Sequence, residues 1–418
     1  RSIPLNASEI PTAKFYSFDH EPAPDSCWSL SAGPDGRIYA ASCCEHVPGG
    51  KAYIVRYDEQ ADALETVVDV PEAVGMPADN GQASQCKIHY SFAASPDGTL
   101  YAATHLSAPG IGTPRMAHWG DWRDARYGFP QSMLLAYDTA ADRLAWTGPF
   151  IPHEGCRCLA LAPQRGLLYA VSYPRDHFWV YDLKRRSIRS LGRLGSVNAQ
   201  TIFTDRLERA YTTNADGQLV RYDPETDTLE ELPVFCPHDP QLRGGWHNVL
   251  YDVAPSPEGD CVYGVPWNSN PHLFRYWPED GPDGRMEDLG PVHQDRDRTM
   301  TVSYYLDHCG GLVFGCDGRL YMGTSRWEPG LELHTASTRE DWKADQVVVA
   351  LDVRTLQRED IARLEKPGSH GNYVSRGARD RNGDLFFGHV NRPVPVGLSR
   401  VVRPAEGEDL HLPLRTWG

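Results

Sequence analysis

The sequence lacks the features that mark several large protein classes. It has no run of about 18 apolar residues, the minimum for a membrane-spanning helix. Its 41 Lys and Arg residues are outnumbered by 56 Asp and Glu, for a net charge of −15. A protein that binds nucleic acid or an anionic membrane needs a basic surface. We therefore expect neither a nucleic acid nor a membrane as partner.

Two common catalytic motifs are absent as well. The chain contains no Gly-x-Ser-x-Gly, the motif that presents a serine nucleophile on a sharp turn. It also contains no glycine-rich loop of the P-loop type, which would hold the phosphates of a nucleotide. These absences argue against a serine hydrolase of that kind and against a P-loop nucleotide enzyme.

What the chain does contain is a repeated turn. It has 38 Gly and 33 Pro, and many of them belong to turns of the type Ser-Pro-Asp-Gly. Proline fixes φ at one position of such a turn, and glycine supplies the positive φ at another. A segment resembling Leu-Tyr-Ala follows each time. Seven of these turns lie at residues 33–36, 95–98, 163–166, 204–208, 256–259, 315–318 and 380–383.

Two further strand-like segments complete each repeat, and the first of them typically ends in Tyr-Asp. Short strands separated by such turns are typical of the four-stranded blades of a propeller. The sequence therefore predicts an all-β fold, a seven-bladed β-propeller of four-stranded antiparallel blades, as a single domain over residues 1–418. The seventh repeat is short of an outer strand, and we expect residues 14–17 to supply it. A long β-sandwich or two smaller β domains are the alternative, but neither repeats one sequence unit in this way.

The first hairpin of each repeat places paired residues at one mouth of the channel. Residues equidistant from a hairpin turn face each other with Cβ atoms about 5 Å apart. Connecting loops gather at this mouth, where function usually resides. A purely structural core would favour small apolar residues there, so histidine, arginine and tyrosine on adjacent blades indicate a functional site. The three pairs are Cys27/Cys43, His89/His105 and Arg157/Tyr173.

Other polar and aromatic residues are expected around the same mouth. The mouth positions carry no pair of Asp or Glu, which hydrolysis by a two-carboxylate glycosidase would need. A cationic, imidazole-rich mouth suits an anionic substrate and β-elimination beside a uronate carboxylate, with His or Tyr moving the proton. Tryptophan would stack on sugar faces. The candidate substrate-binding residues are His118, Trp119, Trp246, His247, Trp267, Tyr304, Arg326, His370, Asn372 and His389.

Several of these segments resemble a known enzyme family. Residues 87–91 (Lys-Ile-His-Tyr-Ser), 118–122 (His-Trp-Gly-Asp-Trp) and 154–161 (Glu-Gly-Cys-Arg-Cys-Leu-Ala-Leu) are similar to segments of the seven-bladed propeller polysaccharide lyases. This group comprises the ulvan lyases and the rhamnose–glucuronate lyases. The resemblance implies that a bond 4-linked to glucuronate is cleaved by β-elimination. The best match in linkage is L-rhamnose-α-1,4-D-glucuronate, as in gum arabic side chains, because few long loops enclose the cleft.

The resemblance also assigns roles to residues. It implies that His89 and His105 carry the proton, that Arg157 neutralises the carboxylate, and that Tyr173 donates a proton or orients the substrate. Two alternatives stay open. One is a propeller glycoside hydrolase that uses a single histidine, and the other is a non-catalytic propeller that binds a glycan.

Cysteine usage leaves the metal question open at this point. The elimination chemistry requires no cofactor, but some relatives hold a metal ion, so Ca²⁺ or Zn²⁺ is a candidate. Thiol and imidazole ligands could come from two sets: Cys236 and His238 with Cys261, or Cys309 with Cys316. The alternative interpretation of these cysteines, and of Cys27 with Cys43, is packing or disulfide bonding, and this is the one we favour.

Two features near the beginning of the chain favour a secreted protein. The sequence starts at Arg1 without Met, which suggests either that a leader was removed or that the sequence was trimmed. Asn6-Ala7-Ser8 is also an acceptor triplet for N-glycosylation.

Overall fold

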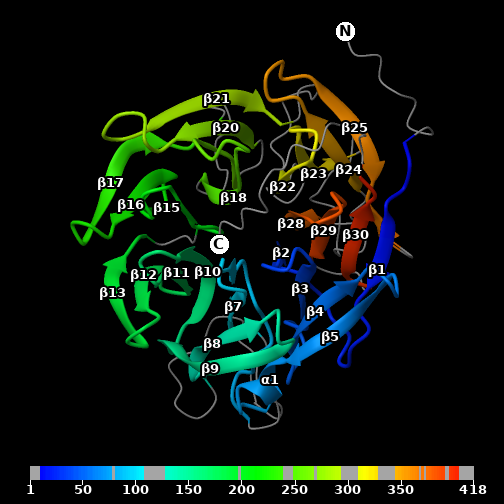
Figure 1. The fold of residues 1–418 in the computed structure, drawn as a ribbon, viewed down its shortest axis with the longest axis vertical. Helices are drawn as coiled ribbons and strands as arrows, with labels where there is room; N and C mark the ends of the chain where they lie inside the picture. The colour runs from blue at the N-terminus through cyan, green and yellow to red at the C-terminus, as the bar shows by residue number, and fades with distance from the viewer. Residues whose placement is uncertain are drawn as a thin grey trace, which may run out of the picture.

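The fold is a ring of seven four-stranded antiparallel sheets, arranged in sequence order around a central axis (Figure 1). The predicted seven-bladed β-propeller is therefore confirmed. The computed structural model describes residues 10–77, 81–107, 128–195, 199–238, 248–267, 271–292, 309–327, 344–366, 369–370, 373–390 and 395–403.

The first four blades follow one another without a break in strand order. Blade one holds β2 (Leu30–Ala32), β3 (Ile38–Cys43), β4 (Ala52–Asp58) and β5 (Ala63–Asp69). Blade two holds β6 (Phe92–Ala94), β7 (Thr99–Ala103), β8 (Gln131–Asp138) and β9 (Arg143–Pro152). Blade three holds β10 (Gly155–Ala162), β11 (Leu167–Tyr173), β12 (His177–Asp182) and β13 (Ser187–Arg193). Blade four holds β14 (Phe203–Thr204), β15 (Ala210–Thr213), β16 (Gln218–Asp223) and β17 (Thr228–Phe235).

The remaining blades complete the ring. Blade five holds β18 (Val249–Pro255), β19 (Val262–Trp267), β20 (His272–Trp277) and β21 (Arg285–Pro291). Blade six holds β22 (Cys309–Phe314), β23 (Leu320–Trp327), β24 (Ala344–Leu351) and β25 (Arg358–Arg363). Blade seven holds β28 (Tyr373–Arg379), β29 (Leu385–Val390) and β30 (Gly397–Val401). A two-stranded hairpin, β26 (Glu365–Lys366) and β27 (Ser369–His370), lies between blades six and seven in the sequence.

The N-terminal strand closes the ring as predicted. Strand β1 (Lys14–Ser17) pairs antiparallel with β30 and becomes the outer strand of blade seven. In Figure 1 this blue strand lies beside the red strand β30. Because the first segment of the chain completes the last blade, opening the ring requires breaking a full strand pair.

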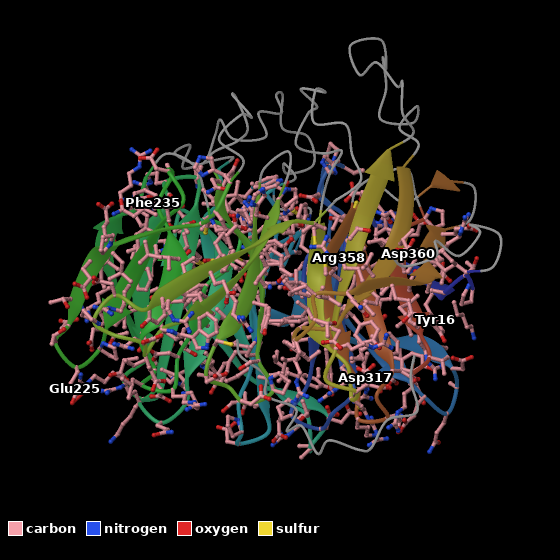
Figure 2. The ribbon with its side chains drawn as sticks, turned by 90° about the horizontal axis from the view of Figure 1, so that it is seen from above. Tyr16, Glu225, Phe235, Asp317, Arg358 and Asp360 are labelled. Atoms are coloured by element: carbon pink, nitrogen blue, oxygen red, sulfur yellow. The ribbon has the colours of Figure 1, made fainter. Side chains whose placement is uncertain are left out.

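The loops divide between two faces of the disc. In Figure 2, Asp317 in a first-hairpin turn and Glu225 in a third-hairpin turn lie on the same face, and Phe235 at the end of β17 lies on the other. The second face is the mouth where each first strand begins and each second strand ends. Every residue of the predicted catalytic set belongs to this face.

The repeated tyrosines and aspartates hold the hairpin turns in shape. In three blades, the tyrosine that precedes the last residue of the third strand donates a hydrogen bond to an aspartate that closes the following turn with positive φ. Aspartate tolerates this left-handed conformation better than most residues. The three pairs are Tyr57/Asp62, Tyr137/Asp142 and Tyr222/Asp227.

The same aspartates also join neighbouring blades. Asp142 of blade two accepts Arg56 of blade one at 2.7 Å, and Asp62 of blade one accepts Arg400 of blade seven at 3.2 Å. At the ring closure, Asp62 further accepts Tyr16 of β1 at 2.5 Å and contacts Lys14. One carboxylate therefore ties the closing strand to blade one.

The described part of the chain contains a single short helix, α1 (Val70–Ala73), capped by Asp69. It adjoins strands β4 and β5. No helix among the described ranges has the length and apolar character that crossing a membrane demands.

Replacing Asp62 by Asn should weaken the ring closure without disturbing the left-handed turn, which Asn also adopts. The ion pairs to Lys14 and Arg400 are lost, so we expect the melting temperature to fall by about 2–4 °C. Asp227→Asn is the matched control, since that residue makes the equivalent turn but does not contact the closing strand. Thermal unfolding checks this, and an equal fall for both variants would contradict a special role for Asp62.

Candidate functional site

An extra residue in the first strand of several blades shapes the mouth of the channel. The β10–β11 ladder shifts register between Cys156 and Cys158, which leaves Arg157 in a bulge. The same one-residue excess occurs in β18 at Tyr251, and in β22 and β28. A bulge frees its residue from the ladder and redirects the side chain.

The bulges correct the expected cross-strand pairs. His105 pairs with Lys87 rather than with His89, and Tyr173 pairs with Gly155 rather than with Arg157. The sixteen-residue spacing was therefore wrong as a register. In blade three the bulge adds a residue to β10, and in blade two the extra residues lie between Lys87 and the start of β6. The predicted residues nevertheless contact one another through their side chains.

The four predicted catalytic residues form one continuous stack. The rings of His89 and His105 lie 5.3 Å apart, and His105 stacks on Tyr173 at 5.0 Å. The guanidinium of Arg157 lies 5.3 Å from the centre of the Tyr173 ring. Both imidazoles are buried, whereas Arg157 and Tyr173 are partly exposed. The sequence thus selected residues that the fold brings together.

Hydrogen bonds fix the same tautomer in both imidazoles. Nδ1 of His89 lies 2.9 Å from the carbonyl oxygen of Arg157, and Nδ1 of His105 contacts the carbonyl oxygen of Leu106. Because a carbonyl only accepts, each Nδ1 must carry the hydrogen. Each Nε2 is then a free lone pair, and neither Nε2 has a hydrogen-bond partner among the described residues.

A buried ion pair supports this stack from blade one. Lys87 Nζ lies 2.5 Å from Glu45 Oε2, and both side chains are almost fully buried. Glu45 also accepts from Trp28 Nε1 at 2.5 Å and from Ser107 Oγ at 3.1 Å. The indole of Trp28 stacks on His89 at 4.5 Å and lies 4.5 Å from Lys87 Nζ. The position of His89 therefore depends on the Glu45–Lys87 pair.

The electrostatic environment keeps both imidazoles neutral. Burial lowers the pKa of His89 and of His105 well below the usual value, and the positive charges of Arg157 and Lys87 lower it further. Burial raises the pKa of Tyr173 to about 12. At neutral pH the site thus contains two unprotonated imidazoles, a protonated phenol and a permanent guanidinium.

Carboxylates are present at this mouth, contrary to our expectation from the sequence. Glu154, immediately before β10, is fully buried. It forms an ion pair with Arg175 and also contacts the hydroxyl of Ser172. Asp176, between β11 and β12, is also fully buried. The carboxylate of Asp176 interacts electrostatically with Arg157 and with Glu154. The sequence pattern missed them because they lie outside the positions that the hairpin symmetry singles out.

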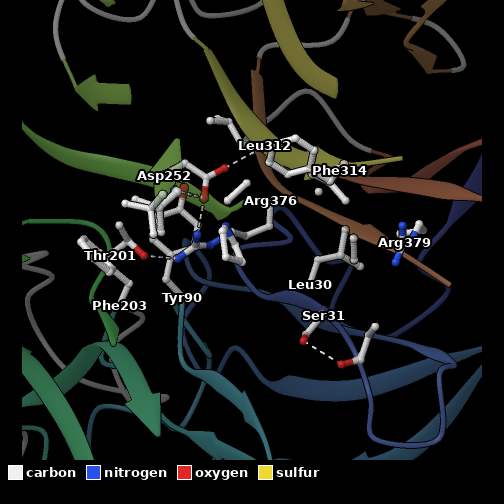
Figure 3. Close-up of a pocket in the computed structure, with 18 of the residues that line it drawn as sticks. Leu30, Ser31, Tyr90, Thr201, Phe203, Asp252, Leu312, Phe314, Arg376 and Arg379 are labelled. Carbon is white, nitrogen blue, oxygen red and sulfur yellow. Dashed lines mark hydrogen bonds and ion pairs between the residues drawn. The ribbon is translucent and has the colours of Figure 1, made fainter. Parts of the chain in front are cut away.

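The site has a closed floor within the channel. Arg376 of the β28 bulge contacts Asp252 of blade five and donates to Thr201 Oγ1 at 2.6 Å (Figure 3). Its guanidinium lies 4.2 Å from the centre of the Tyr90 ring, and Tyr90 packs edge-on against His89 at 4.6 Å. Burial raises the pKa of Asp252, although Arg376 opposes this. Below this layer is a cavity lined by Leu30 and other channel residues.

The remaining predicted residues have different outcomes. Trp267 is partly buried in the core, 5.9 Å from Tyr251, whose ring is 5.7 Å from Tyr90. His389 is buried in blade seven, where its Nε2 lies 2.6 Å from Ser399 Oγ. The side chains of the other candidates lie outside the described residues: His118, Trp119, Trp246, His247, Tyr304, Arg326, His370 and Asn372.

The cysteines form no disulfide. All ten have free thiols, including Cys27 and Cys43, so the disulfide alternative was wrong and the packing interpretation is confirmed. Cys43 Sγ instead accepts the backbone N–H of Ile88 at 3.5 Å. Burial raises the pKa of Cys43 well above its usual value, which makes the thiol unreactive.

One group of described side chains has the composition of a metal site. Ligand atoms of Asp25, Glu45 and His46 lie within 4.8 Å of one another. Glu45 already binds the ammonium of Lys87, and Asp25 accepts His46 Nδ1 at 2.8 Å. A bound cation would have to displace these donors and lie beside a positive charge. The cluster therefore does not fit Ca²⁺ or Zn²⁺, and the predicted thiol and imidazole sets form no group of three ligands among the described residues.

Comparisons with known proteins identify the fold and nothing finer. No family model matches the sequence, and no curated protein matches it. Among solved structures, it is similar to the extracellular domain of the putative hybrid two component system BT4673 from B. thetaiotaomicron, with TM-score 0.56 and 15% identity over 93% of this chain. This chain spans only 39% of that protein's length.

Other solved structures are about as similar. The WD40 repeats of RRP9 give TM-score 0.56 and 10% identity, covering 94% of this chain and 98% of that one. Hydrazine synthase of Kuenenia stuttgartiensis gives TM-score 0.53 and 11% identity, covering 95% and 98%. At such identities the likeness shows a β-propeller, so function has to be argued from the site itself.

Replacing Lys87 by Met should destabilise the protein strongly, because Glu45 would be left charged and buried without its partner. We expect a loss of about 3–5 kcal/mol in the free energy of unfolding. The double variant Lys87→Met/Glu45→Gln should recover most of it, since neither residue of the pair is then charged. Lys51→Met is the control, because its pair with Asp69 is much more exposed and worth at most about 1 kcal/mol. Denaturant unfolding checks this, and additive losses in the double variant would refute the coupling.

Proposed function

We propose that this protein is a polysaccharide or oligosaccharide lyase that cleaves a bond 4-linked to glucuronate by β-elimination. The observation that carries the proposal is the stack of His105, Tyr173 and Arg157, in which the buried imidazole has an Nε2 without a hydrogen-bond partner among the described residues. Elimination beside a carboxylate needs a base, an acid and a positive group, and the stack contains one of each.

The protonation states suggest a division of labour. His105 is neutral at physiological pH, so its Nε2 can accept the proton from the carbon beside the carboxylate. Tyr173 stays protonated, so its hydroxyl can donate a proton to the leaving oxygen. As the C–H bond breaks, its electrons form the carbon–carbon double bond and the glycosidic C–O bond breaks.

Arg157 would neutralise the uronate carboxylate and so lower the barrier to removing the adjacent proton. His89 is then a positioning residue, because its Nδ1–H holds the carbonyl of Arg157 within the bulge. As the first substrate to test we propose the L-rhamnose-α-1,4-D-glucuronate linkage of gum arabic, with ulvan as the second.

Hydrolysis is the second candidate, and one observation favours it. Glu154 and Asp176 supply the buried carboxylates that a glycosidase would use. Glu154 is already engaged by Arg175 and Ser172, whereas Nε2 of His105 has no hydrogen-bond partner among the described residues. The two reactions differ in product, because only elimination leaves an unsaturated uronate that absorbs ultraviolet light.

The test is to incubate the protein with gum arabic and with ulvan while following ultraviolet absorbance and new reducing ends. We expect both signals to rise together, and His105→Ala to lower kcat by about 100-fold or more. His272→Ala, on the Asp288 pair of blade five, is the matched control and should leave the rate unchanged. Reducing ends without absorbance would indicate hydrolysis, and glycan binding without any cleavage would indicate a binding protein.

The pH dependence of kcat gives a further check. The pKa of His105 lies well below its usual value and that of Tyr173 lies near 12. Neither side chain therefore changes its protonation state at pH values between these two. The pH dependence of kcat reports which groups ionise in the bound complex. Because His105 and Tyr173 should not ionise there, we expect kcat to stay level from about pH 6 to pH 9. A fall in kcat centred near pH 6.5 would instead point to an ordinary exposed histidine.

A further inference from the structure

One buried group at the mouth has no role in the elimination chemistry. The side chain of Asp176 is fully buried, and neither carboxylate oxygen has a hydrogen-bond partner among the described residues. Its backbone has a φ of 60° and is held by the N–H of Leu194, which donates to the Asp176 carbonyl at 2.8 Å. An ionised carboxylate is costly in such a place unless a charge or a proton compensates it.

The charged groups around Asp176 come from three elements. Arg157 on β10 and Arg193 at the end of β13 favour the ionised carboxylate, and Glu154 before β10 opposes it. Arg175, in the same loop as Asp176, and His177, the first residue of β12, both lie beside Glu154. Burial is the largest effect and raises the pKa of Asp176 to about 7.

Arg157 is therefore shared between two anions. In the free protein its charge partly compensates Asp176, and in the proposed reaction the same charge binds the substrate carboxylate. When a substrate carboxylate binds to Arg157, the guanidinium no longer compensates the charge of Asp176. An ionised Asp176 would then repel the substrate.

We propose that Asp176 takes up one proton from solvent when a uronate carboxylate binds to Arg157. This inference rests on the proposed function, since it uses the same arginine for the same ligand group. Only an O–H bond on the Asp176 carboxyl is formed, and the proton is released when the ligand leaves. Asp176 thereby couples binding of an anionic sugar to pH.

The sign of the coupling follows from linkage. If binding takes up a proton, affinity rises as pH falls. With half of Asp176 protonated near pH 7, affinity for a uronate should be about tenfold higher at pH 6 than at pH 8. The imidazoles do not contribute over this range, because their pKa values lie well below it. A neutral sugar should show no such dependence.

The experiment is isothermal titration calorimetry of the full chain with D-glucuronate, repeated in phosphate and in Tris, whose ionisation enthalpies differ. At pH 7 we expect uptake of about half a proton per uronate bound, and a roughly tenfold change in Kd between pH 6 and pH 8. D-glucuronamide, which lacks the charge, is the ligand control. Asp176→Asn should bind glucuronate with the same Kd at both pH values and with no proton uptake.

Asp182→Asn is the protein control, because Asp182 ends β12 at the other end of the same blade. It should behave as the unmodified protein does. Uronate binding without proton uptake, or with uptake that persists in Asp176→Asn, overturns the role of Asp176 and leaves the lyase proposal intact. Absence of uronate binding overturns both.

A stability measurement tests Asp176 without any ligand. Its folded-state pKa lies above the unfolded value of about 4, so ionisation destabilises the folded protein as pH rises from about 4 to 7. Asp176→Asn should therefore melt several degrees higher than the unmodified protein at pH 8 and at the same temperature near pH 4. Asn tolerates the left-handed backbone at this position. Equal melting temperatures at pH 8 would show that the carboxylate is not strained in the fold, which contradicts the proposal.

Discussion

The arrangement of the mouth depends on one buried ion pair, Glu45 with Lys87. The pair joins the β3–β4 loop of blade one to the segment that precedes blade two, and the indole of Trp28 contacts both Lys87 and His89. A buried pair of this kind contributes less to stability than to uniqueness, because either charge alone would be expelled from the interior. Any rearrangement that separated the two blades here would therefore also displace the imidazole stack.

The bulges are the second constraint, and they explain how a repetitive fold carries a site without symmetry. Each bulge is the same local event, one extra residue in a first strand. Its outcome depends on which side chain it redirects. In blade three it directs Arg157 towards Tyr173, whereas in blade seven the bulge includes Arg376, which spans the channel to Asp252. Bulges of the same kind therefore place Arg157 in the stack with Tyr173 and Arg376 in the floor of the site.

The sequence predicted the propeller well because its repeat is enforced locally. The turns need Asp and Gly, and the tyrosines need a carboxylate to bind, so both recur where they can be counted. It also predicted that His89, His105, Arg157 and Tyr173 would meet. It missed Glu45 and Asp176 because their roles arise between blades and within a loop. It gave the wrong register because a bulge leaves no periodic trace: Arg157 looks like any other residue of its strand until the ladder is seen.

The charge distribution of the site follows from these constraints and differs from that of the whole chain. The protein carries a net charge of −15, yet the centre of the mouth combines Arg157 and Lys87 with two imidazoles that burial keeps neutral. Glu45 neutralises Lys87, so the main positive charge beside the imidazoles, among the described residues, is the guanidinium of Arg157, which Asp176 compensates only in part. An anion entering the mouth would meet that guanidinium beside Tyr173. If the protein acts on a glycan as we propose, an acidic surface around a cationic centre would favour ligands that carry one carboxylate on an otherwise neutral body, such as a glycan with isolated uronates.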